Sequence, residues 1–125
     1  GRPGVEADVV GATVEALKKQ GALTITAWIG PSVCGKCYEV PEAMRATVAA
    51  GEPTAYSTTS WGTPALDLPA AVVSQLEPAH VTTHNVGVCT LENSNFYSHR
   101  RAVRDGEAEG RFIGFAIKNQ GLALQ

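Results

Sequence analysis

Apolar residues recur at helical spacing near the start of the chain and predict a helix over residues 5–20. One stripe is formed by the residues at i, i+3, i+7 and i+10: Ala7, Val10, Val14 and Leu17. Acidic residues open this stretch, lysines close it and Gly21 is a suitable stop. A strand is predicted directly afterwards, at residues 24–29, where alternate residues are apolar. A helix joined so closely to a strand suggests a layered α/β unit.

Two further helices are predicted in the middle of the chain. The first covers residues 41–51, because proline is tolerated in the first turn and glycine ends a helix. The second covers residues 66–76, with Asp67 as a suitable N-cap. Between them, residues 51–64 are polar and rich in turn formers. We expect this segment to be the longest loop, either disordered or a lid.

Two later segments are typical of strands, residues 80–88 and residues 112–118. The second has three apolar residues on one face: Ile113, Phe115 and Ile117. His80 and His84 share one face of the first predicted strand and would lie about 13 Å apart. That separation is too large for a shared metal ion, so we expect exposed histidines.

Composition and charge narrow the function classes. The chain has 125 residues, of which 44% are apolar and 18% charged, and a net charge of −2. This balance gives no electrostatic argument for binding nucleic acid or anionic membranes. No apolar run approaches the roughly 20 residues of a membrane span. Three cysteines cannot all pair within one chain, so we expect a reducing, cytoplasmic location.

The strand predicted at residues 24–29 ends at Gly30-Pro31 and leads into a small polar loop with two cysteines, Cys34-Gly35-Lys36-Cys37. This spacing occurs in redox dithiols, but a redox dithiol places its first cysteine at a helix N-terminus, and the following residues are typical of a strand. It also occurs in zinc sites, where Cys89 and one of the histidines at 80, 84 and 99 would complete four ligands. The ordinary alternative is that these small thiols pack in a tight loop.

A second informative stretch runs from Cys89 through turn formers and aromatic residues to Arg100-Arg101. Two more arginines follow at Arg104 and Arg111. Guanidinium groups beside aromatic rings suit a planar or phosphorylated anionic ligand. The alternative is a solvated face, because acidic residues are interleaved with the arginines: Asp105, Glu107 and Glu109.

At these two loops the chain resembles the YfiH-like family of laccase-domain and purine nucleoside phosphorylase proteins. The family's Gly-Pro segment is matched at residues 30–33 and its aromatic-Glu-Val segment at residues 38–40. Its Leu-Asp-Leu helix start is matched at residues 66–68. Its Cys-Thr and Phe-aromatic-Ser segments are matched at residues 89–90 and 96–101, followed by Gly-Arg at residues 110–111. His99 replaces the usual tyrosine, and Arg100-Arg101 and Arg104-Asp105-Gly106 both remain candidates for the family's arginine pair.

The resemblance implies an α+β layered sandwich with mixed sheets, of which residues 1–125 are a single, partial domain. Residues 1–4 look like the tail of a His-Ala-Gly-Trp-Arg-Gly loop, so we expect a fragment without the N-terminal half. The implied activity is zinc-dependent phosphorolysis of adenosine or inosine, with adenosine deamination as a side activity. Two alternatives are a copper polyphenol oxidase of the laccase type and a non-catalytic binding module. A laccase needs about ten copper ligands, mostly imidazoles, and this chain has three histidines.

The resemblance also implies roles for particular residues. The zinc ligands, two histidines and a cysteine, belong to the preceding half, so we expect no metal ligand in this chain. Copper is the less suitable metal. The expected partners are a purine nucleoside and phosphate. The residues expected to bind them are anion donors and members of the cysteine loop: Arg2, Ser32, Cys34, Arg100 and Arg101.

Overall fold

The computed structural model describes residues 1–118. Its N-terminal segment forms two helices, α1 (Arg2–Glu6) and α2 (Val9–Lys19). The prediction of one continuous helix over residues 5–20 was therefore wrong. The break lies at Asp8, whose backbone is in the left-handed region with a φ of 48°. The Asp8 carboxylate accepts a hydrogen bond from the N–H of Gly11 at 3.0 Å. Asp8 is therefore the N-cap of α2 and not a first-turn residue of a longer helix.

Strands β1 (Thr26–Ile29) and β4 (Thr82–Asn85) form a parallel pair, with Thr26 opposite Thr82 and Ile29 opposite Asn85. The strand predicted at residues 24–29 is confirmed, and the one predicted at residues 80–88 is shorter than expected. Because the strands are parallel, the loops that follow them leave from the same edge of the sheet. This edge carries the cysteine loop.

The two histidines do not share a strand as predicted. His80 precedes β4, at the end of the short 3₁₀ turn η2 (Glu77–Ala79), with a φ of 53°. His84 lies in β4, and its ring stacks on Trp28 of β1 with ring centroids 5.5 Å apart. A left-handed residue cannot continue a strand ladder, which explains the later start of β4.

Residues 51–64 form structure where a loop was predicted. Helix α3 (Glu42–Gly51) confirms the predicted helix at residues 41–51 and is followed by the 3₁₀ turn η1 (Pro53–Ala55). Strands β2 (Tyr56–Thr58) and β3 (Pro64–Leu66) then pair as an antiparallel hairpin. The hairpin turn is closed by Thr59, whose N–H donates to the Thr63 carbonyl at 2.9 Å. The turn-forming residues here connect two ordered strands, so the expectation of a disordered loop was wrong.

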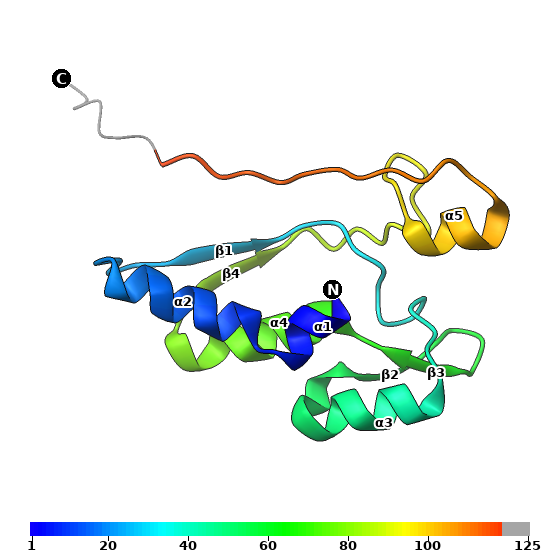
Figure 1. Cartoon of the computed structure of the whole chain (residues 1–125), viewed down its shortest axis with the longest axis horizontal. Coiled ribbons are helices and arrows are strands. Elements are labelled where there is room, and N and C mark those ends of the chain that lie inside the picture. The colour runs from blue at the N-terminus through cyan, green and yellow to red at the C-terminus, as the bar shows by residue number, and fades with distance from the viewer. Residues whose placement is uncertain (119–125) are drawn as a thin grey trace.

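Helix α4 (Leu68–Leu76) confirms the helix predicted from Asp67, whose carboxylate accepts a hydrogen bond from the Ala70 N–H at 2.9 Å. It contacts α1, α2, η1 and β4, and Figure 1 shows it with α1 and α2 on one side of the β1–β4 pair. The buried core joins this layer to α3 and the hairpin and comprises Val5, Val40, Val48, Ala55, Leu66 and Ala71. Helices with small parallel and antiparallel sheets confirm the predicted α+β class.

Helix α5 (His99–Asp105) was not predicted. Ser98 caps its start, because the Ser98 Oγ accepts a hydrogen bond from the Arg101 N–H at 3.3 Å. Gly106 ends it with a φ of 70°, the left-handed conformation that glycine adopts without strain. The helix therefore begins and ends at residues with ordinary capping chemistry.

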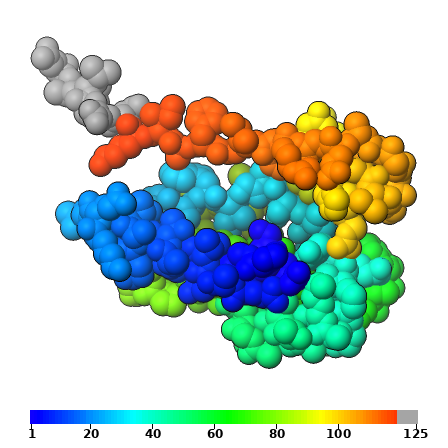
Figure 2. Space-filling model, in the orientation of Figure 1, coloured from blue at the N-terminus to red at the C-terminus, as the bar shows by residue number. Residues whose placement is uncertain are grey.

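The segment predicted as the last strand, residues 112–118, is extended but belongs to no strand pair among residues 1–118. Without a partner strand its backbone groups face solvent, and its apolar residues Ile113, Phe115 and Ile117 are exposed. Figures 1 and 2 show the segment running back along the β1–β4 side of the molecule. A groove of about 720 Å³ separates it from Thr26, Trp28 and Gly30. Within residues 1–118, no helix has the length and apolar character to cross a membrane.

Candidate functional site

The loops that follow β1 and β4 lie side by side at the carboxyl edge of the parallel pair. Ser32 and Cys89 form an isolated parallel bridge that continues the pairing of the two strands. The Ser32 N–H donates to the Val88 carbonyl at 3.1 Å, and the Thr90 N–H donates to the Ser32 carbonyl at 3.0 Å. These bonds place the cysteine loop against Cys89, which is 55 residues distant from Cys34 in the sequence.

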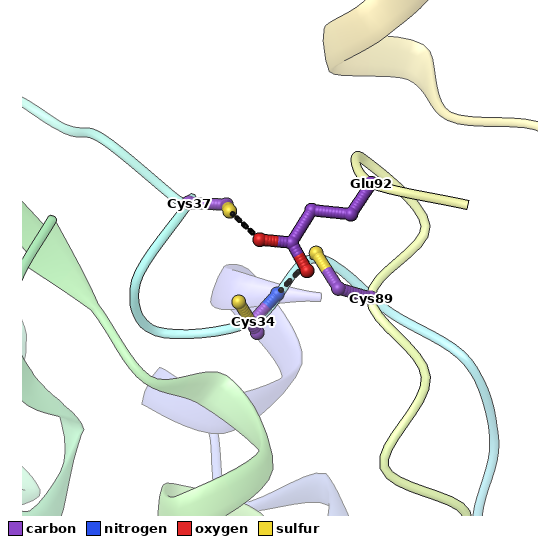
Figure 3. A group of neighbouring side chains, drawn as sticks. All are labelled: Cys34, Cys37, Cys89 and Glu92. Atoms are coloured by element: carbon purple, nitrogen blue, oxygen red, sulfur yellow. Dashed lines mark hydrogen bonds between the residues drawn. The ribbon is translucent and has the colours of Figure 1, made fainter. Parts of the chain in front are cut away.

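Four potential metal ligands meet where these loops touch. One ligand atom from each residue lies within 4.8 Å of the others in the group of Cys34, Cys37, Cys89 and Glu92, which Figure 3 shows. The Cys37 thiol donates to Glu92 Oε1 at 3.2 Å, and the Cys34 N–H donates to the Cys89 sulfur at 3.4 Å. Cys37 and Cys89 are buried, and the three thiols are free. We call this group the thiol cluster.

The cluster contains three of the four ligands considered under the zinc-site alternative, but its fourth member is a carboxylate, not a histidine. His80 and His84 have the positions given above. His99 Nδ1 lies 2.6 Å from Oε1 of Glu109, a residue that follows α5 in the sequence. Sequence reasoning missed Glu92, although its position three residues after Cys89 repeats the spacing of the other cysteine pair.

The thiols differ in their electrostatic surroundings. Burial raises the pKa of Cys34 and Cys37, and for Cys37 the Glu92 carboxylate adds to the rise. Burial alone would also raise the pKa of Cys89, but backbone N–H groups of the two loops outweigh it, so that pKa is lowered. Cys37 N–H and Tyr38 N–H both donate to the Cys34 carbonyl, which makes a turn and not a helix start. The prediction that Cys34 lacks a helix N-terminus is confirmed, and the geometry does not favour a thioredoxin-like dithiol.

A pocket of about 320 Å³ opens beside the thiol cluster, between the cysteine loop and the start of α5. Three aromatic residues line it: Tyr38, Tyr97 and Phe112. Polar groups come from Ser32, His99 and Arg100. The Arg100 guanidinium lies 4.9 Å from the centre of the Tyr38 ring, and its Nη1 donates to the Glu39 carbonyl at 2.6 Å. The exposed rings of Tyr97 and Phe112, the half-buried ring of Tyr38 and a nearby cation make this pocket suitable for a planar ligand with an anionic group.

Arg101 has a different environment from Arg100. Its side chain is buried, its Nε donates to Glu107 at 2.6 Å, and its Nη2 donates to the Phe96 carbonyl at 2.8 Å. Its Nη1 donates to the carbonyls of Thr90 and Asn93. The guanidinium thus connects α5 to the loop that carries Cys89 and Glu92.

The two later arginines, Arg104 and Arg111, pair with acidic residues close to them in the sequence. Arg104 Nε donates to Asp105 at 2.6 Å, and Arg111 Nη1 donates to Glu109 at 3.2 Å. These pairs are exposed and correspond to the solvated-face alternative. Of the arginines at positions 100, 101, 104 and 111, Arg100 alone lines the pocket of about 320 Å³.

The other predicted site residues are divided between two places. Ser32 lines that pocket and also a second one of about 250 Å³, which Cys34 and Asp67 line too. Arg2 lies in α1, forms an ion pair with Glu6 at 2.6 Å and lines neither pocket. The structure thus brings Ser32, Cys34 and Arg100 to one region. Arg101 is buried beside it, between α5 and the loop that carries Cys89. Sequence reasoning missed the aromatic lining, because Tyr97 and Phe112 meet only through the fold.

Comparison with known proteins identifies the class. The profile of the family described as multi-copper polyphenol oxidoreductase laccase matches residues 1–119, so the chain belongs to this family, which is the YfiH-like family. A purine nucleoside phosphorylase of Streptomyces coelicolor is 51% identical over 113 residues, covering 88% of this chain and 47% of the relative. Similar relatives, also named purine nucleoside phosphorylases, occur in Mycobacterium tuberculosis (38%, 85% of this chain and 44% of the relative) and Corynebacterium glutamicum (33%, 88% and 46%). The chain therefore spans about half the length of the curated relatives it matches.

Proposed function

We propose that this chain forms one wall of the nucleoside site of a purine nucleoside phosphorylase. In this reaction phosphate attacks C1′ of adenosine or inosine, the bond to the purine breaks, and free base and ribose 1-phosphate are formed. The names of the relatives support the activity, and identities of 33–51% over most of this chain support transferring it. Hydrolytic deamination of adenosine is proposed as a side activity.

The observation that carries the proposal is the pocket beside Arg100. A purine is planar and aromatic, so the rings of Tyr38, Tyr97 and Phe112 offer it apolar and stacking contacts. Negative charge is present on phosphate and develops on the leaving purine, and a guanidinium can donate two hydrogen bonds to such a group. Among residues 1–118 the hydrogen bonds of Arg100 to the chain engage only Nη1. The other guanidinium nitrogens are available to substrate.

The other site residues keep distinct proposed roles. Ser32 and Cys34 belong to the loop that shapes the pocket, and Arg2 remains a proposed anion donor. For Arg101 we propose a structural contribution, because its guanidinium is engaged by Glu107 and backbone carbonyls. It would act on substrate only by holding the neighbouring loop in place.

Zinc and the general base are proposed to belong to the part of the relatives that this chain does not span. A bound zinc ion would supply a Lewis acid and a water molecule of lowered pKa. Within residues 1–118 no histidine joins a group of possible metal ligands, so the resemblance's two-histidine, one-cysteine set is not assembled there. Three free thiols suit the proposed cytoplasmic location. The charge balance gives no reason to propose nucleic acid or membrane partners.

The family description also names a copper oxidase of phenols. The chain's three histidines lie apart: His84 stacks on Trp28, His99 contacts Glu109, and His80 follows η2. A blue and trinuclear copper assembly needs imidazoles brought together, so the described residues do not fit it. A non-catalytic binding module is the remaining alternative.

Phosphorolysis of inosine by the intact protein tests the proposal. We expect phosphate-dependent release of hypoxanthine, and a loss of roughly 10- to 100-fold in kcat/KM for Arg100→Ala, because a charge-assisted hydrogen bond is removed. Arg100→Lys should recover only part of the loss, since an ammonium cannot reproduce the two-pronged contact.

Arg104→Ala is the matched control, because Arg104 has the same charge on the same helix but an exposed partner in Asp105. Its rate should equal that of the unmodified protein. Absence of base release, together with oxygen uptake on phenols, would replace the proposal with the copper oxidase. Absence of both activities would favour the binding module, and an unchanged rate in Arg100→Ala would remove Arg100 from the site.

A further inference from the structure

The thiol cluster has the composition and shape of a metal centre that the proposed phosphorolysis does not use. Its members come from two loops, each supplying a pair of ligands separated by two residues: Cys34 with Cys37, and Cys89 with Glu92. Each pair is closed by its own turn, through the Cys37 N–H donating to Cys34 and the Asn93 N–H donating to Cys89, both at 3.0 Å. Figure 3 shows the four side chains converging from the two loops.

We propose that Cys34, Cys37, Cys89 and Glu92 bind one zinc ion in a tetrahedral, structural site. Zinc–sulfur bonds of about 2.3 Å place the sulfurs of a tetrahedral site about 3.8 Å apart. The four ligand atoms already lie within 4.8 Å of one another, so zinc binding requires only a contraction on the order of 1 Å. On binding, zinc takes the place of the thiol protons, which pass to solvent.

The donor set favours zinc among the common metals. Three thiolates are soft ligands that select zinc or monovalent copper, whereas a carboxylate oxygen is better suited to zinc than to monovalent copper. The Cys34 N–H that donates to the Cys89 sulfur is an outer contact that orients a ligand, as metal sites commonly have. This proposal replaces our sequence-based expectation that the chain contains no metal ligand.

The site would hold the two loops that form the pocket. Ser32 and Tyr38, which line the pocket, flank the cysteine pair in the sequence, and Thr90 lies between Cys89 and Glu92. Arg101 already holds the second loop to α5 through backbone carbonyls. Zinc would add coordinate bonds to the hydrogen bonds that already join the two loops. The inference stands on the cluster alone and does not require the phosphorylase activity.

Metal content of the intact, reduced protein tests the site. After loading with zinc and removal of unbound metal, Cys37→Ser and Cys89→Ser are each expected to carry one zinc equivalent per chain fewer than the unmodified protein. Glu39→Gln, a change to a carboxylate outside the cluster, is the control and should retain the full content. A difference measured in this way is unaffected by a second metal site elsewhere in the protein. Equal zinc in the cysteine variants and the unmodified protein would overturn the proposal.

Alkylation mapped by mass spectrometry tests it without any substitution, in case a cysteine variant fails to fold. We expect zinc to protect Cys34, Cys37 and Cys89 together, and a chelator to expose all three together. Alkylation of the three sites that is unchanged by chelation would contradict a metal site. A disulfide between Cys34 and Cys37 forming under mild oxidant, without protection by zinc, would assign the pair to redox chemistry instead. Neither measurement depends on phosphorolysis. Failure of the zinc proposal would therefore leave the proposed function standing.

Discussion

Gly35 lies so close to the N-cap of α4 that a larger residue has no room. A Cβ atom added at Gly35 would lie 2.6–2.7 Å from atoms of the Asp67 side chain, and the Gly35 carbonyl accepts a hydrogen bond from Ser57 at 2.7 Å. Gly35→Ala should therefore destabilise the protein by about 1–3 kcal/mol, because Asp67 must move away from its capping position. Thermal unfolding followed by circular dichroism would measure the change.

Gly51→Ala is the control for Gly35→Ala. Gly51 ends α3, and a Cβ atom added there meets nothing within 4 Å. Alanine also has the higher helix propensity, so this variant should be as stable as the unmodified protein or slightly more stable. Equal melting temperatures for Gly35→Ala and the unmodified protein would show that the loop is not held against α4.

Glu39 provides a residue-scale prediction about pH. Hydrogen bonds from Thr63 and Trp61, and then the charge of Arg100, lower the pKa of this exposed carboxyl. A carboxyl whose pKa is lowered by folding stabilises the folded state at pH values above its pKa in the unfolded chain. This contribution is lost as the pH falls through the pKa of the folded state. The melting temperature of Glu39→Gln should thus lie below that of the unmodified protein at neutral pH, with a gap that narrows on acidification. A gap independent of pH would contradict this linkage.

At the scale of elements, the sequence predicted those whose signals are local. Asp67 followed by an apolar helix led to α4, and Gly51 gave the end of α3. Asp8 was missed as a cap because acidic residues in a first turn and at an N-cap give the same pattern. The β2–β3 hairpin was missed because each strand is only three residues long, too short for alternation to be read. Helix α5 had a usable signal, with Ser98 before it and Gly106 after it.

Arg101 connects two elements, and its loss should affect stability more than binding. Arg101→Ala leaves the carbonyls of Thr90, Asn93 and Phe96 without their charged donor, so we expect a loss of roughly 2–3 kcal/mol. Denaturant unfolding would measure it. Arg104→Ala removes an exposed pair and should change stability by less than about 0.5 kcal/mol. A stable Arg101→Ala protein with a large loss in kcat/KM would instead return Arg101 to the substrate.

At the scale of the whole molecule, the candidate site depends on one long-range contact that no local pattern contains. The parallel pairing of β1 with β4 brings residues 32–37 against residues 89–92. The sequence could therefore suggest that Cys34, Cys37 and Cys89 belong to one group of metal ligands. It could not show which polar residue completes the group. Histidine was the natural expectation from residue type, whereas the fold turns Glu92 toward the thiols. The strand prediction for residues 112–118 failed for the same reason. An alternating segment forms a strand only beside a partner strand, and this segment pairs with none among residues 1–118.

Removing zinc should loosen one region of the molecule and leave the rest in place. A ligand that binds only the folded state adds about 2.7 kcal/mol of stability at 100 times its Kd, so chelation of a bound zinc ion should lower the melting temperature. Hydrogen exchange should become faster in residues 32–40 and 88–96, whose backbones form the two joined loops. Exchange in α3 should be unchanged, because its main contacts with other elements are to η1, β2 and β3, none of which carries a member of the thiol cluster. Exchange that rises equally in all elements would mean that the metal supports the whole fold, and exchange that does not rise in the two loops would mean that no metal joins them.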